Sequence, residues 1–126
     1  MKILVLISRF LLGLVFVVFG LNGFLHFIPA QMPPGLAGQF AGAMHQSHYD
    51  LVVSAIQVIG GVLLLVNRYL PLALTLLGPV IVNILLFHAL LFPQGLATAV
   101  VVAVLWFILF FRYREYFSGL FVQRAS

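Results

Sequence analysis

The sequence predicts an all-α protein, a membrane-spanning four-helix bundle with both termini on the cytoplasmic side. Three observations support this prediction. Of the 126 residues, 64% are hydrophobic and only 6% are charged, and the mean hydropathy is +1.25. Three breaks, at residues 29–34, 67–71 and 93–95, divide the apolar sequence into four stretches. In a four-span topology, all six Lys and Arg residues fall on one side of the membrane.

The composition excludes several classes of protein. Soluble domains have about 45–50% apolar and about 25% charged residues, so this chain lacks the polar atoms that a water-facing surface needs. The net charge of +4 comes from scattered basic residues and forms no basic face, so we expect no nucleic-acid partner. The chain has no cysteine, which excludes disulfides, thiolate metal sites and cysteine nucleophiles. We expect one domain over residues 1–126.

The four stretches have the length that a membrane span needs. A helix crosses the hydrocarbon core with about 20 apolar residues, and we expect helices at about residues 3–28, 49–67, 70–91 and 95–115. The first stretch begins like a signal peptide. Its apolar run continues past residue 20 with no small-residue cleavage site, so we expect a retained first helix.

The positions of the basic residues predict the orientation. Lys and Arg concentrate in cytoplasmic connections, and here they flank the first helix, occupy the second connection and follow the fourth helix: Lys2, Arg9, Arg68, Arg112, Arg114 and Arg124. The connection at residues 29–49 is therefore expected outside. In it Leu36, Phe40, Ala43 and Met44 recur at helical spacing, which predicts a short amphipathic helix on the outer surface.

Polar side chains inside so apolar a chain are the candidate functional residues. With this orientation, all four histidines and nearly every polar group of the spans lie in the outer half. We expect five of them to line one outward-facing pocket: Asn22, His26, Gln57, Asn83 and His88. A ligand there would have an apolar body and a few polar acceptors, as a quinone has. The competing interpretation is that the histidines are interfacial and that the amides join helices by hydrogen bonds.

Other polar residues give weaker signals. His45 and His48 are spaced i, i+3 and could present two imidazoles to one metal ion or one haem edge, a motif of low specificity. Because this motif has low specificity, a quinone in the outer pocket is the leading candidate cofactor, and haem is the less favoured one. Asp50 is expected to cap the second span, and Pro79 is expected to kink the third. Asp50 and Glu115 are the only acids in the sequence, which excludes a carboxylate relay across the membrane.

Two segments resemble the DoxX family of small membrane proteins. Residues 8–16, SRFLLGLVF, followed by FGLNG at residues 19–23, are similar to the opening helix of that family, and residues 57–65, QVIGGVLLL, are similar to its next segment. The resemblance implies a four-helix bundle in a bacterial cytoplasmic membrane. Some relatives are linked to quinone-dependent redox systems. Members often have a Lys near the outer end of the first helix, where this chain has Gly23 and Phe24, and no catalytic residue carries over.

Three functions remain open at this point. The first is an accessory or structural membrane subunit, whose partners would be membrane lipid and other membrane subunits. The second is a quinone-associated redox component that uses the outer pocket. The third is a small-solute carrier, which receives little support because the sequence places no charge within the spans.

Overall fold

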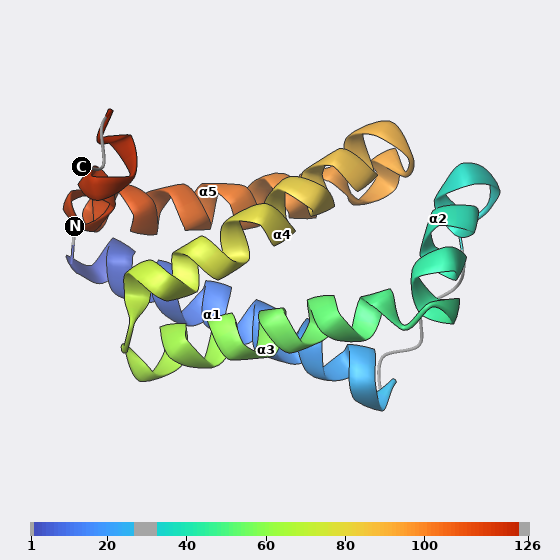
Figure 1. Cartoon of the computed structure of the whole chain (residues 1–126), viewed down its shortest axis with the longest axis horizontal. Helices are drawn as coiled ribbons and strands as arrows, with labels where there is room; N and C mark the ends of the chain where they lie inside the picture. Colours follow the sequence, from blue (N-terminus) through green and yellow to red (C-terminus); the bar gives the residue numbers. More distant parts are fainter. Residues whose placement is uncertain (1, 27–32, 124–126) are drawn as a thin grey trace.

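The computed structural model describes residues 2–26 and 33–123, and these residues are helical apart from the turns (Figure 1). The four long helices are α1 (Lys2–Leu25), α3 (Tyr49–Val66), α4 (Leu70–Leu90) and α5 (Leu96–Arg112). Helix α2 (Gly35–Gln46) lies between α1 and α3 in the chain, the short helix η1 (Pro93–Gly95) lies between α4 and α5, and η2 (Arg114–Phe121) follows α5. Four segments are long and apolar enough to cross a membrane: α1, α3, α4 and Pro93–Arg112. The predicted all-helical class and the four candidate spans are confirmed.

The boundaries of α3 and α4 lie within one residue of the sequence prediction. The first and last helices end earlier than expected: α1 ends at Leu25, with His26 already outside the helix, and α5 ends at Arg112 where residue 115 was predicted. The amide of Tyr113 bonds to the carbonyls of Leu109 and Phe110, and the chain continues as the 3₁₀ helix η2. Of the predicted extension of the first helix to residue 28, residues 27 and 28 lie outside the described residues.

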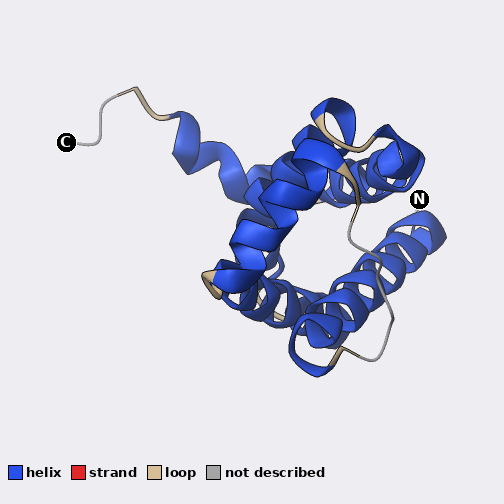
Figure 2. Cartoon of the chain, turned by 90° about the vertical axis from the view of Figure 1, so that its right-hand side faces the viewer, coloured by secondary structure: helices blue, strands red, loops and turns tan. Residues whose placement is uncertain are grey.

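The four long helices form a closed ring of neighbours. Helix α1 packs along α3, α3 against α4, α4 against α5, and α5 against α1. Figure 2 shows them around a common axis. Each contributes one apolar row to the core, whose largest fully buried apolar side chains are Leu12, Phe16, Leu64, Leu74, Leu77 and Leu109.

Helices α1 and α3 approach each other to backbone contact. A Cβ atom added to Gly13 would lie 3.0 Å from the carbonyl oxygen of Gly61, and one added to Gly61 would lie 2.8 Å from the carbonyl oxygen of Gly13. Near the other end of the pair, a Cβ atom on Gly23 would overlap the side chain of Ser54. Small residues allow this approach, and van der Waals packing then holds apolar helices together.

Arg9 is buried between α1 and α3, with 8% of its surface exposed. Its Nη1 donates to the carbonyl oxygens of Leu64 at 2.6 Å and Leu65 at 3.3 Å. These carbonyls belong to the last turn of α3, where the helix dipole is negative and few carbonyl groups have a partner within the helix; that of Leu64 also accepts from the amide of Asn67. The sequence predicts Arg9 only as a basic residue flanking the first helix, with no charge within the spans. In the structure Arg9 instead lies buried within α1, and its guanidinium donates to the end of α3.

Helix α2 lies at the opposite end of the bundle from Lys2 and the α3–α4 turn (Figure 1). It is attached to the bundle through few side chains: Ala37 is 1% exposed, and the ring of Phe40 lies 5.8 Å from the ring of Phe87 on α4. The two residues between α2 and α3 turn the chain sharply, because His48 has a left-handed φ of 62°. Helix α2 thereby comes to lie across the ends of α3 and α4.

Candidate functional site: a pocket beneath α2

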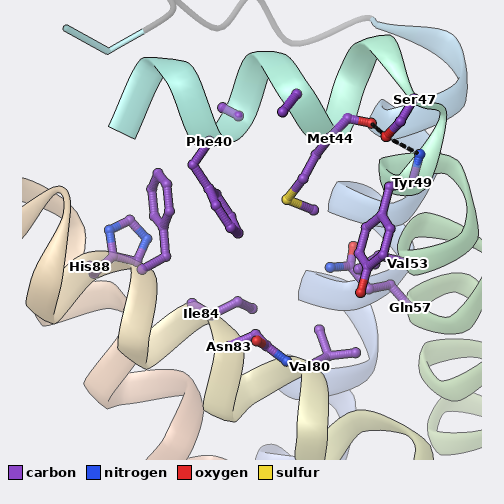
Figure 3. A pocket seen from close by; sticks show the side chains of 13 residues that line it. Phe40, Met44, Ser47, Tyr49, Val53, Gln57, Val80, Asn83, Ile84 and His88 are labelled. Carbon is purple, nitrogen blue, oxygen red and sulfur yellow. Dashed lines mark hydrogen bonds between the residues drawn. The ribbon is translucent and has the colours of Figure 1, made fainter. Parts of the chain in front are cut away.

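A cavity of about 660 Å³ lies between α2, α3 and α4. We call it the α2 pocket. Figure 3 shows Phe40 and Met44 projecting from α2 as its roof, Val53 and Gln57 on the α3 wall, and Asn83 and Ile84 on the α4 floor. The remaining lining residues are Ala41, Ala43, Ser47, Tyr49, Val80, Phe87 and His88. The lining is thus mainly apolar, with a few polar groups.

Two amides lie at the base of the pocket, one on each side. The Nδ2 of Asn83 donates to the carbonyl oxygen of Pro79 at 2.9 Å, so the amide is held by its own helix. Gln57 is half-buried and makes no hydrogen bond with the described residues, so its amide is open to the pocket. These are the groups that can orient a ligand there.

His88 lies at one edge of the pocket in a fixed tautomer. Its Nδ1 is 3.1 Å from the carbonyl oxygen of Phe92, and because a carbonyl can only accept, Nδ1 carries the proton. Nε2 of the neutral ring is then an acceptor. The ring also lies against Gly95, where an added Cβ atom would overlap it. A larger residue in the turn before α5 would therefore displace the imidazole.

The structure brings three of the five predicted pocket residues together and places the other two elsewhere. Gln57, Asn83 and His88 line the α2 pocket, whereas Asn22 and His26 do not. His26 follows the end of α1, and its ring lies edge-on to that of His45 at 5.8 Å. The physical reason is the contact between α1 and α3 through glycines. That contact occupies one side of α3, while the pocket opens on its α4 side.

The histidines near α2 form a polar cluster outside the pocket. Nδ1 of His45 is 3.1 Å from Oδ2 of Asp50, whose other oxygen is buried without a hydrogen-bond partner among the described residues. His48 is the residue that precedes α3, so Asp50 lies in the first turn of that helix and is not its cap, contrary to expectation. No group of three metal-ligating side chains occurs among the described residues. The pair His45 and His48 therefore gains no third protein ligand there.

Sequence reasoning missed the roof of the pocket. Phe40 and Met44 were assigned to the apolar face of a surface helix, and that face instead covers the cavity. Their spacing of four residues does predict that both side chains lie on one face of α2, but it does not show whether lipid or protein packs against that face. Tyr49 and Phe87 gave no such signal, because aromatic residues are common throughout this chain.

A scan against protein-family models, a search of curated proteins and a search of solved structures found no match to this chain. The resemblance to the DoxX family therefore stays a prediction based on the segments at residues 8–23 and 57–65.

Proposed function

We propose that this chain is an accessory subunit of a membrane system, related to the DoxX family, and that it holds a lipid-soluble ligand of the quinone type in the α2 pocket. The observation that carries the proposal is the pocket itself. Ligand sites are concave, mostly apolar and about 300–1,000 Å³ in volume, with a small number of polar groups that fix orientation. A cavity of about 660 Å³ with two amides and one imidazole has these properties.

We place the pocket at the outer side of a bacterial cytoplasmic membrane, with both termini inside. Support comes from the distribution of charge. The basic residues within the described ranges belong to the first third of α1, the α3–α4 turn, the end of α5 and the start of η2, which lie toward the end of the bundle remote from α2 (Figure 1). Basic residues favour the cytoplasmic side. Helix α2 would then lie at the outer interface, as an amphipathic helix does.

The chemistry of the pocket favours holding a ligand over transforming it. Its hydrogen-bonding side chains are Gln57, Asn83 and His88, together with the hydroxyls of Ser47 and Tyr49 at the α2–α3 turn. These groups can orient a headgroup, and electron transfer would then require a partner subunit with a redox centre. The third function considered, a solute carrier, gains nothing from Arg9, because two carbonyl groups already hold its guanidinium.

The test is to fill the pocket and measure what purifies with the protein. Ile84 lies on the pocket floor, and Val82 on the same helix is exposed and does not line the pocket. We expect Ile84→Trp to remove the lipid-soluble compound that extraction and mass spectrometry detect in the purified protein. The control Val82→Trp adds the same side chain outside the pocket and should retain the compound. Equal amounts of quinone-type compound in both variants, or none in the unmodified protein, would refute the proposal.

A further inference from the structure

The α2 pocket has a specific hydrogen-bonding polarity, because two of its polar side chains already use donors within the protein. Asn83 uses one N–H of its amide on Pro79, which directs Oδ1 away from that bond. His88 uses its Nδ1 proton on Phe92, which leaves Nε2 without a proton in the neutral ring. Both partners are backbone carbonyls, which cannot donate, so neither assignment can be reversed. Oδ1 of Asn83 and Nε2 of His88 therefore remain as acceptors for a ligand, beside the second N–H of Asn83. A hydroxyl group can both donate to such acceptors and accept from that N–H, whereas a carbonyl oxygen can only accept.

The other polar side chains do not oppose this polarity. Gln57 makes no hydrogen bond with the described residues, and its amide has both a donor and an acceptor, so it can rotate to suit the group it meets. The hydroxyl of Tyr49 can likewise donate or accept, and that of Ser47 already donates to the carbonyl oxygen of Met44. An acceptor that a bound ligand covers without donating to it loses its hydration, which costs about 1–3 kcal/mol. A ligand that brought only carbonyl oxygens would leave Oδ1 of Asn83 and Nε2 of His88 without partners.

The apolar part of the lining favours a flat ring. Phe40 and Phe87 lie with their ring centroids 5.8 Å apart and their planes inclined by 38°. Met44 projects from the roof beside Phe40 (Figure 3). Aromatic rings pack favourably in offset or edge-to-face arrangements, and a thioether makes favourable contacts with a ring. The roof is thus suited to an aromatic headgroup above the two amides.

We infer that the α2 pocket selects the hydroxyl-bearing form of its ligand, a phenol or hydroquinone, over the carbonyl-bearing quinone. The inference rests on the proposed function and specifies its ligand class. The hydroxyl groups donate to Oδ1 of Asn83 and to Nε2 of His88, while the ring packs beneath Phe40 and Met44. A subunit with this preference holds the reduced carrier and releases the oxidised one.

The experiment compares three probes that share one decyl tail: a hydroquinone, the corresponding quinone and the hydroquinone dimethyl ether. The dissociation constant of each is measured with the purified full-length protein in lipid nanodiscs under anaerobic conditions. A thiol reductant keeps the hydroquinone reduced and leaves the protein unchanged, because the chain has no cysteine. We expect the hydroquinone to bind about five- to tenfold more tightly than the other two probes, the ratio given by about one net hydrogen bond.

A pair of matched variants assigns the preference to the pocket. Asn83→Leu removes one of the two acceptors and should reduce the ratio between the dissociation constants of the dimethyl ether and the hydroquinone, while Nε2 of His88 retains the remainder. Thr75→Val is the control. The hydroxyl of Thr75 also donates to a proline carbonyl four residues earlier on α4, that of Pro71 at 2.8 Å, but Thr75 does not line the pocket. Its variant should keep the full ratio.

The outcomes separate the inference from the function on which it rests. If the three probes bind equally, or if the quinone binds most tightly, the selectivity is refuted and ligand binding stands. If none of the probes binds, the proposed function fails and the selectivity fails with it. A hydroquinone preference that is undiminished in Asn83→Leu would also overturn the inference, because Oδ1 of Asn83 would then contribute nothing to it.

Discussion

Arg9 is the residue whose environment departs most from what its type prefers. A guanidinium inside an apolar bundle is costly unless hydrogen bonds compensate for its lost hydration. Here the compensation comes from the end of a neighbouring helix, where the guanidinium donates to the carbonyls of Leu64 and Leu65, of which that of Leu64 also accepts from the amide of Asn67. The cation and the carbonyl groups thus satisfy each other, and the pair joins α1 to α3.

Replacing Arg9 should therefore destabilise the bundle. We expect Arg9→Leu to lower the free energy of unfolding by about 1–3 kcal/mol, because it removes the side-chain donor to Leu65 and leaves the carbonyl of Leu64 with the amide of Asn67 alone. Arg9→Lys should lose less, since an ammonium group still donates. Thermal unfolding in detergent, followed by the fluorescence of Trp106, measures the change. Arg112→Leu, at an exposed position at the end of α5, serves as the control; a loss as large as that of Arg9→Leu would contradict the account.

At the scale of the elements, the contact between α1 and α3 determines how the polar residues are distributed. The spans were predictable because apolar length and Pro or Gly breaks are local properties of the sequence. The neighbours of each helix were not predictable. A polar residue such as Asn22 or Gln57 indicates which face of its helix is polar, but it does not indicate which other helix packs against that face. Gly13, Gly20 and Gly61 permit the contact between the backbones of α1 and α3, but a glycine in the sequence does not show which helix it will meet.

The α1–α3 contact makes a prediction about side-chain size. Gly61→Leu should lower the free energy of unfolding by about 1–3 kcal/mol or more, because a side chain there meets the backbone of Gly13 and must push the helices apart. Gly42→Leu on α2 is the control, because a Cβ atom there meets nothing within 4 Å. Thermal unfolding of both variants checks the prediction, and equal midpoints would show that α1 and α3 do not depend on close approach.

At the scale of the whole molecule, the sequence predicted the class and the charge asymmetry but only part of the site. Gln57, Asn83 and His88 were predictable because each is polar and lies in the half of its helix toward the α2 end of the bundle. The roof was not, because its position depends on the turn at His48, where a left-handed φ directs α2 back over α3 and α4. A backbone conformation of this kind in a non-glycine residue gives no reliable sequence signal.

The proposed orientation can be tested on a chain that contains no cysteine. We expect Gln39→Cys, at an exposed position on α2, to react with a membrane-impermeant maleimide on intact spheroplasts, and Gln123→Cys, after η2, to react only after permeabilisation. The unmodified protein provides the background. Labelling of both positions on the same side would exclude the four-span topology.

Because α2 is attached to the bundle through few side chains, the folding stability of this region should depend on whether a ligand occupies the α2 pocket. The roof touches the rest of the molecule mainly at its edges, so a molecule held in the α2 pocket would supply much of the apolar surface that Phe40 and Met44 otherwise lack. Such a ligand becomes part of the folded core of this region, and its binding free energy adds to that of folding by mass action. The abundance of the protein in a membrane would then follow the concentration of the compound that it holds.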